Sequence, residues 1–240
     1  MANIQTEMGR NRTGIATSPK LTEEMIAGTS EFFPLDEDGD ASVIARVRED
    51  YARNADPLGS VPPPATLTGM AKTALRGVKG ERPTQLADKL GERLAFERAG
   101  VRLYDALLSK LDAFGSFDGG PLRGELEEIQ REEYEHYRML AQAVEQTGGD
   151  PTVITPSADL HATMTSGVMA VLVDPRTSLV QCLEAALLAE LADNAGWEAL
   201  AQLASQGGDE ELARRFQEAQ QDEVVHLDQV KRWLAAAQQR

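Results

Sequence analysis

The sequence of 240 residues has a single cysteine, few aromatic residues and no long apolar run. One cysteine excludes an intramolecular disulfide framework, and it excludes a rubredoxin-type iron site, which needs four cysteine ligands. The longest apolar stretch, residues 168–173, is far shorter than the roughly 20 residues of a membrane helix. The first residues also lack the basic segment and apolar core of a secretory signal. These absences predict a cytoplasmic protein without a membrane span.

Basic residues are also scarce, with 24 Lys and Arg against 39 Asp and Glu and a net charge of −15. Such a surface repels polyanions, so we expect no nucleic-acid partner. Aromatic residues make up only 5% of the chain, whereas the helix formers Ala, Leu, Glu and Gln are abundant. The composition therefore predicts an all-α protein.

Proline and glycine separate the first 82 residues from the rest of the chain. Prolines at 19, 34, 57 and 62–64 leave room only for short helices, which the pattern predicts at 21–27, 42–53 and 67–76. We expect residues 1–82 to form an N-terminal arm of short helices and Pro/Gly-rich loops. Such an arm wraps over a neighbour or is partly mobile.

Four long helical patterns follow from residue 83 onward. The first two cover residues 84–114 and 121–147. The third is predicted to begin with Asp174 as N-cap and Pro175 in the first turn, and the fourth begins after Asp209 as N-cap. Two short loops and a crossover over residues 148–173 connect them. Residues 83–240 are therefore predicted to form an antiparallel four-helix bundle of two helix hairpins.

Each of these helices has an apolar seam, defined by a seven-residue repeat, with a carboxylate near its middle. Two of the seams also carry a histidine three residues later, on the same face because residues i and i+3 are neighbours on a helix. The seam residues are Glu97, Glu133 with His136, Glu190, and Glu223 with His226.

Four carboxylates that converge inside a bundle repel one another and take up protons. A pair of metal cations removes that cost and accepts carboxylate oxygens and imidazole nitrogens as ligands. One Glu from each of two helices plus Glu-x-x-His from each of the other two is the ligand set of dinuclear carboxylate bundles. The alternative is a metal-free bundle with solvated glutamates. The chain has only three histidines, and two of them fit the motif, which favours the metal.

An internal repeat supports this interpretation. Glu97 precedes Glu133 by 36 residues, and Glu190 precedes Glu223 by 33. When the helices are aligned on Glu97 and Glu190, the segment 103–107 matches 196–200. Two hairpins related by a pseudo-two-fold axis would each contribute half of a metal pair.

On these positions, and on residues 207–213 before the last motif, the sequence from about Thr84 resembles the ferritin-like superfamily. Within it, the chain is most similar to the rubrerythrin or erythrin branch. The resemblance implies a ferritin-like fold with two iron ions, although Glu and His ligands also suit manganese. The implied bridging ligands are Glu133 and Glu223. The implied terminal ligands are Glu97 with His136 and Glu190 with His226.

The resemblance also assigns residues around the metal pair. Tyr104, one heptad after the first ligand, matches a familial tyrosine that hydrogen-bonds a ligand carboxylate. Rubrerythrins have a glutamate three residues after the third-helix ligand, where this chain has the shorter Asp193. We expect Asp193 to reach the metals only through water or to hydrogen-bond a ligand histidine. His161, in the crossover, is expected to be a surface or locally hydrogen-bonded residue, and Glu132 a flanking residue of its helix.

The favoured function is an oxidoreductase in which the metal pair reacts with O2 or hydrogen peroxide, of ferroxidase or peroxidase type. Its electron donor is not identified by the sequence, and we expect a homo-oligomer, a dimer. Three alternatives stay open. They are a manganese-catalase-like enzyme, a non-enzymatic iron-binding or stress-interaction protein whose arm docks on a partner, and an oxygenase that needs an apolar channel for an organic substrate.

Overall fold

The computed structural model describes residue 10 and residues 14–32, 41–78 and 83–239. Within these ranges all regular structure is helical and no strand occurs, which confirms the predicted fold class. The elements in chain order are η1 (Ile15–Thr17), α1 (Pro19–Phe32), α2 (Ala41–Asn54), α3 (Leu67–Val78), α4 (Pro83–Phe114), α5 (Arg123–Thr147), α6 (Pro156–Val173), α7 (Leu179–Gln206) and α8 (Glu210–Gln238). None of the described helices is long and apolar enough to cross a membrane.

The described residues fall into two compact units. The first ends at Pro57, and the second begins at Leu58. The first unit contains α1 and α2, which cover two of the helices predicted for the arm, and α2 buries none of its residues. The second unit contains α3 and all the longer helices. The predicted boundary at residue 82 lies outside the described residues.

The segment around α3 is attached to the loop that follows α5. The backbone N–H of Ala65 donates a hydrogen bond to the carbonyl oxygen of Gly148 at 3.0 Å. Gly148 has a positive φ of 91°, and a Cβ on Gly69 would lie only 2.9 Å from its Cα. Glycine is therefore required on both sides of this contact.

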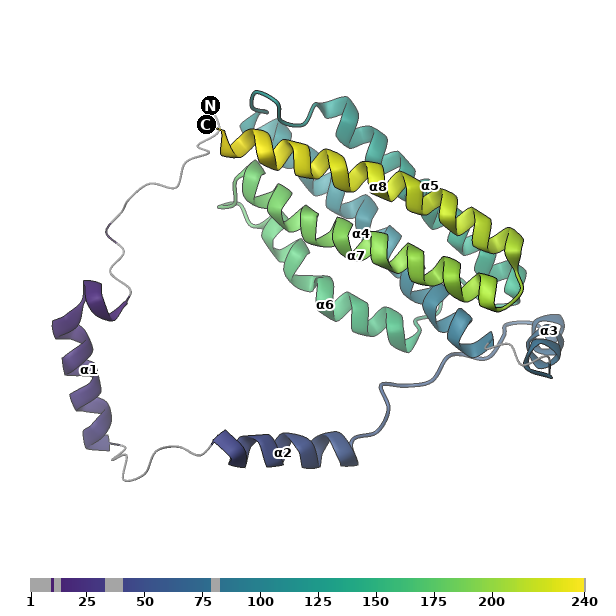
Figure 1. Ribbon diagram of the computed structural model, residues 1–240, viewed down its shortest axis with the longest axis horizontal. Coiled ribbons are helices and arrows are strands. Elements are labelled where there is room, and N and C mark those ends of the chain that lie inside the picture. The colour runs from purple at the N-terminus through teal and green to yellow at the C-terminus, as the bar shows by residue number, and fades with distance from the viewer. Residues whose placement is uncertain (1–9, 11–13, 33–40, 79–82, 240) are drawn as a thin grey trace. The chain divides into compact units, whose positions relative to one another are not determined.

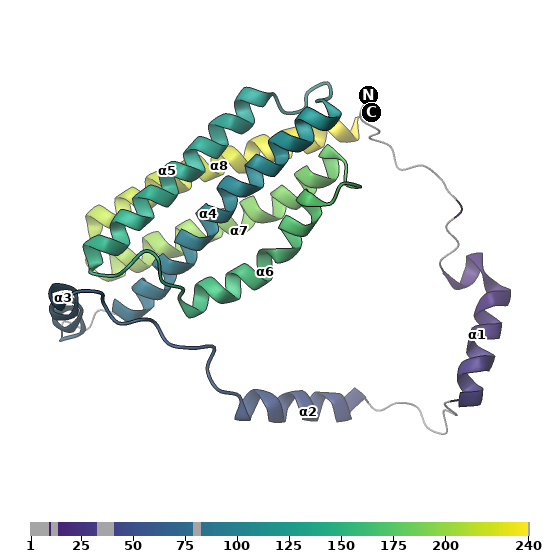
Figure 2. The same cartoon turned by 180° about the vertical axis from the view of Figure 1, so that it is seen from behind.

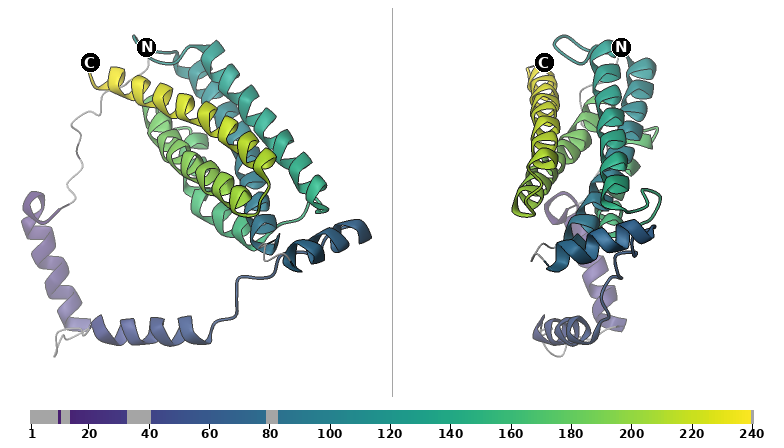
Figure 3. Two further views of the ribbon diagram at one scale, coloured as in Figure 1. Left: turned by 45° about the vertical axis from the view of Figure 1, so that its right-hand side comes forward. Right: turned by 90° about the vertical axis from the view of Figure 1, so that its right-hand side faces the viewer.

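The bundle is built from two antiparallel hairpins, α4–α5 and α7–α8 (Figures 1 and 2). Helix α4 packs beside α7, and α5 packs beside α8, so the four helices enclose one interior. The predicted crossover contains an 18-residue helix, α6, which packs against α4 and α7 on the outside of the bundle. Figure 3 shows this fifth helix and the two hairpins from two further directions.

The predicted start of the third bundle helix is wrong. Asp174 ends α6 instead, and its carboxylate accepts a hydrogen bond from the backbone N–H of Arg176 at 2.9 Å. Helix α7 begins at Leu179 with a capping box, in which Ser178 Oγ accepts from the N–H of Gln181 at 3.3 Å and Gln181 Oε1 accepts from the N–H of Ser178 at 2.9 Å. This reciprocal pair satisfies two helix-end donors, which the isolated Asp-Pro pair does not.

The N-cap predicted for the last bundle helix is confirmed, because Asp209 Oδ1 accepts a hydrogen bond from the N–H of Leu212 at 3.2 Å. The second bundle helix begins at Arg123, two residues after the predicted Pro121. These differences concern helix ends and leave the seams in register.

The apolar core has two parts along the length of the bundle. One part includes Leu107, Ile129, Leu183 and Val230, and the other includes Leu90, Leu140, Trp197 and Phe216. Each of the four bundle helices contributes to both parts, so a buried zone remains between them. The seam glutamates lie in that zone.

Candidate metal centre

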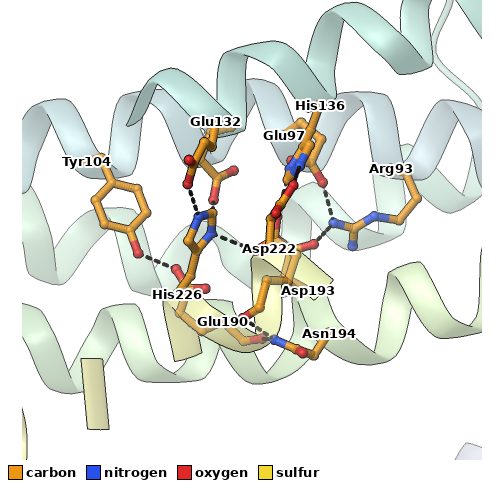
Figure 4. A network of polar contacts seen from close by, with 12 residues as sticks. Arg93, Glu97, Tyr104, Glu132, His136, Glu190, Asp193, Asn194, Asp222 and His226 are labelled. Atoms are coloured by element: carbon orange, nitrogen blue, oxygen red, sulfur yellow. Dashed lines mark hydrogen bonds and ion pairs between the residues drawn. The ribbon is translucent and has the colours of Figure 1, made fainter. Parts of the chain in front are cut away.

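A cluster of charged side chains is buried between the two parts of the core (Figure 4). Each bundle helix contributes one glutamate, and α5 and α8 each add the histidine three residues further on. Such burial costs free energy unless another charge or a metal compensates it. The structure brings together in this cluster, away from solvent, all the residues that the sequence predicts as metal ligands: Glu97, Glu133, His136, Glu190, Glu223 and His226.

Glu223 on α8 lies at the centre, between the two histidines. Its Oε1 is 2.8 Å from His136 Nδ1, and its Oε2 is 3.0 Å from His226 Nδ1. Burial alone would raise the pKa of Glu223, but its contacts with His136 and His226 lower it to about 2. One carboxylate therefore faces both histidines, one with each oxygen.

Two groups of potential ligand atoms overlap at Glu223, and the atoms of each group lie within 4.8 Å of one another. The first group consists of Glu97, His136 and Glu223, and the second of Glu133, Glu223 and His226. A third group adds Asp193 to three of the glutamates. The arrangement therefore offers two adjacent positions for cations that share Glu223.

Four carboxylate oxygens in the cluster are buried and have no hydrogen-bond partner. Three of them are Oε2 of Glu97, Glu133 and Glu190, and the fourth is Glu223 Oε1, which lies in ion-pair contact with His136 Nδ1. Unsatisfied buried acceptors are rare in folded proteins because each one costs free energy. A metal cation would satisfy them, so the residues present fit a pair of divalent ions.

Gly100 on α4 makes room for one of these carboxylates. A Cβ at this position would lie 2.8 Å from Glu133 Cδ and closer still to Oε2. Any larger residue would push the Glu133 side chain away from the cluster. Burial and the neighbouring Glu223 raise the pKa of Glu133 well above its ordinary value.

Glu190 on α7 is held by Tyr104 on α4, whose hydroxyl donates a hydrogen bond to Glu190 Oε1. This is the kind of contact that the resemblance implies for Tyr104. Burial and Glu223 raise the pKa of Glu190 to about 8. Asn194 connects the same region to α8, because its Nδ2 donates to the carbonyl oxygens of Glu190 at 3.0 Å and Glu223 at 2.9 Å.

Two acidic residues that the sequence reasoning missed bind the outer nitrogens of the histidines. His136 Nε2 lies 3.3 Å from Asp222 Oδ2 on α8, and His226 Nε2 lies 2.8 Å from Glu132 Oε2 on α5. Glu132 is thus more than the flanking residue expected from its place on the helix. Such partners fix the ring orientation and direct Nδ1 at the cluster. The available signal is an acidic residue directly before each Glu-x-x-His motif.

The histidines are held in their charged form when no metal is bound. Burial acts to lower the pKa of both rings, but contacts with carboxylates dominate. Glu223 and Glu97 raise the pKa of His136 to about 10, and Glu223 and Glu190 raise the pKa of His226 to about 9. A metal ion must therefore displace protons from these rings.

A buried arginine, Arg93 on α4, is the second feature that the sequence reasoning missed. Its Nη2 donates to Glu97 Oε1 at 2.6 Å and also to Asp193 Oδ1. Asp193 thus points into the cluster, but the partner that it contacts is this arginine and not a histidine. Burial raises the pKa of Asp193, and Arg93 opposes that rise. The spacing of Arg93 and Glu97 predicts a helical ion pair but says nothing of its burial.

His161 on α6 lies outside the cluster but is not a surface residue. It is buried, its ring packs edge-on against Phe96 with centroids 4.7 Å apart, and its Nδ1 is 3.6 Å from Glu92 Oε1. Burial and the nearby Arg93 lower the pKa of His161. The contact with Glu92 joins α6 to α4 and is longer than a hydrogen bond, so this ring shows neither the exposure nor the local hydrogen bond expected for it.

A family model described as the ferritin-like domain matches residues 118–239, just over half of the chain. The chain therefore belongs to the ferritin-like family. The match covers α5 to α8 and leaves out α4, which carries Arg93, Glu97 and Tyr104. No curated protein and no solved structure matches the chain.

Proposed function

We propose that this chain is a di-iron carboxylate protein of the rubrerythrin type that reacts with O2 or hydrogen peroxide as a ferroxidase or peroxidase. The observation that carries the proposal is the position of Glu223, which presents one oxygen to each of two histidines. Around it, three further glutamates each keep a buried oxygen without a partner.

The ligand assignment is the one that the resemblance implies. The groups of ligand atoms support it for five of the six residues, since Glu190 is in none of these groups. Glu97 and His136 would hold one ion, and Glu190 and His226 the other, while Glu133 and Glu223 would be shared between them. The pair of ions would supply the redox chemistry, and this donor set accepts iron or manganese. Iron is preferred because of the resemblance to rubrerythrins.

The other residues of the site orient these ligands. Glu132 and Asp222 accept from the Nε2 atoms of the histidines, so each Nδ1 is free to bind metal once its proton has left. The hydroxyl of Tyr104 holds Glu190 Oε1, which leaves Oε2 for the ion. The chain thereby positions the ligand atoms before metal arrives.

A small apolar cavity supports a small oxidant as the substrate. Its volume is about 30 Å³, and it lies between α4, α6 and α7 beside Glu133 and Glu190. The remaining lining is largely apolar and includes Phe96, Val168 and Met169. Because a water molecule needs about 10–15 Å³ of such space, the cavity has room for a diatomic molecule.

The test is metal content followed by oxidation. The full chain, purified without added metal, is analysed for metals, loaded anaerobically with Fe2+ and mixed with O2 or hydrogen peroxide while its optical spectrum is recorded. We expect two ions per chain and a spectral change on mixing. Glu133→Ala and Glu223→Ala should lose the ions.

Glu135→Ala is the matched control, because Glu135 is on the same helix as Glu133 and is exposed, where it pairs with Arg131. It should bind two ions. Absence of bound iron in the unaltered protein, or two tightly bound ions in both Glu133→Ala and Glu223→Ala, would show that the proposal is wrong.

A further inference from the structure

The two hairpins repeat the ligands of the site but not its surroundings. Each hairpin has a seam glutamate on its first helix and a Glu-x-x-His motif on its second. When the two hairpins are aligned on Glu97 and Glu190, however, the position four residues earlier is Arg93 in the first hairpin and Ala186 in the second. The position three residues later is Gly100 in the first hairpin and Asp193 in the second. One half of the centre thus has a buried arginine and the other half lacks it.

The structure accommodates Arg93 with specific packing. The side chain is almost completely buried, and its guanidinium group lies 4.4 Å from the centroid of the Phe96 ring and 5.5 Å from that of Trp197. A Cβ on Gly196 would lie 3.0 Å from Arg93 Cζ and closer still to Nη1. The absence of a side chain at Gly196 therefore makes room for the guanidinium group.

Arg93 changes what its neighbours can offer to a metal. It occupies Oε1 of Glu97, so that only Oε2 stays free. It also pairs with Asp193. Among the carboxylates in the three groups of potential ligand atoms, Asp193 is the one that is not a seam glutamate. On the opposite side, Glu190 is held by the uncharged hydroxyl of Tyr104. The two terminal glutamates are thus held by a cation and by a neutral donor.

We propose that Arg93 is a positioning residue that makes the two metal positions unequal, with the first ion bound at the position of Glu190 and His226. The second ion then binds more weakly, beside Glu97 and His136. The inference rests on the proposed function, because it needs two metal positions. It adds an order of filling and names the residue that causes it.

The physical reason is repulsion between fixed positive charge and an incoming cation. The guanidinium group is a direct neighbour of Glu97, and like charges at such range in a protein interior repel strongly. Asp193 offsets part of this charge but is itself withheld from the metal by the pairing. We therefore expect Arg93 to widen the gap between the two binding constants by at least about tenfold.

The test is equilibrium dialysis of the full chain against Mn2+, with bound ions counted by elemental analysis and the two stepwise constants fitted. The variant is the double substitution Arg93→Gln with Asp193→Asn, which removes both charges of the Arg93–Asp193 ion pair and leaves the net charge of the cluster unchanged. The gap between the constants should shrink by about tenfold or more. Arg93→Lys keeps the positive charge and should keep the gap. Circular dichroism checks that each variant is folded.

Arg98→Gln is the matched control, since it removes the same charge from the exposed face of the same helix and should leave both constants unchanged. An unchanged gap in the double variant, or an equal loss of the gap in Arg93→Lys, overturns the inference while leaving two bound ions and the proposed function intact. Absence of Mn2+ binding by the unaltered protein and by every variant overturns both.

Discussion

Replacing Gly100 by alanine should separate the stability of the bundle from its capacity to bind metal. Gly100 is in the middle of α4, three residues after Glu97, and faces Glu133 on α5. A Cβ there would lie 2.8 Å from Glu133 Cδ and 3.5 Å from Cγ. Because both backbones are fixed by helix packing, the Glu133 carboxylate has to turn away from the cluster.

The two consequences of the substitution differ in size. Alanine favours a helix over glycine by about 1 kcal/mol, and the displaced atoms are the end of a flexible side chain. The free energy of unfolding without metal should therefore change by no more than about 1 kcal/mol, or at most about 4 °C in Tm. Metal binding loses a shared ligand. Even an outer-sphere residue is worth about 10–100-fold in affinity, so we expect a loss of at least about 100-fold.

Gly167→Ala provides the matched control. Gly167 is an exposed glycine within α6, and a Cβ there would meet open space, so alanine gains helix propensity without touching the cluster. The assay is thermal unfolding by circular dichroism with and without Mn2+. At 100 times the dissociation constant, metal should raise the Tm of the control by about 5–10 °C. The same rise in Gly100→Ala would refute the reasoning.

Metal affinity should rise with pH, because His136 and His226, whose pKa values are raised to about 10 and about 9, must lose protons before they bind metal. Calorimetry at pH 7 in buffers of different ionisation enthalpy should show net proton release, and equal heats in all buffers would contradict this. Tyr104→Phe leaves Glu190 Oε1 without its donor, so we expect a loss of about 1–3 kcal/mol in stability, measured by urea unfolding, and metal affinity about 10–100-fold weaker. A protein shortened to residues 82–240 should stay helical and bind two ions in dialysis, since every proposed ligand lies on α4 to α8. A shortened protein that is soluble but binds no ion would show that the arm completes the site.

The heptad pattern predicts the bundle well because the seams depend on local periodicity. Apolar residues at seam spacing have one way to be buried in a bundle, so the glutamates between them have to point inward as well. Helix ends are harder to predict. Asp174 and Ser178 both suit an N-cap, and the choice depends on Gln181, which completes a capping box with Ser178. The signal for the correct start is therefore present in the sequence, three residues beyond the cap.

The burial of Arg93 is a feature that the sequence does not predict. Four residues before Glu97, an arginine is typical of an exposed ion pair on a helix surface. Its burial depends on space left by Gly196, on the face of Trp197 and on the partner Asp193, all of them on α7. These contacts join residues about a hundred positions apart in the sequence, so no local pattern on α4 predicts them.

Charge balance explains why Arg93 and Asp193 occur together. Four seam glutamates would balance the two divalent ions of the proposed site, so a fifth buried carboxylate requires a further positive charge inside the cluster. Arg93 supplies that charge, since it pairs with Asp193 and is itself buried. Either residue alone would leave an uncompensated buried charge, which typically costs about 3–5 kcal/mol. The function of Asp193 therefore has to be understood together with that of Arg93.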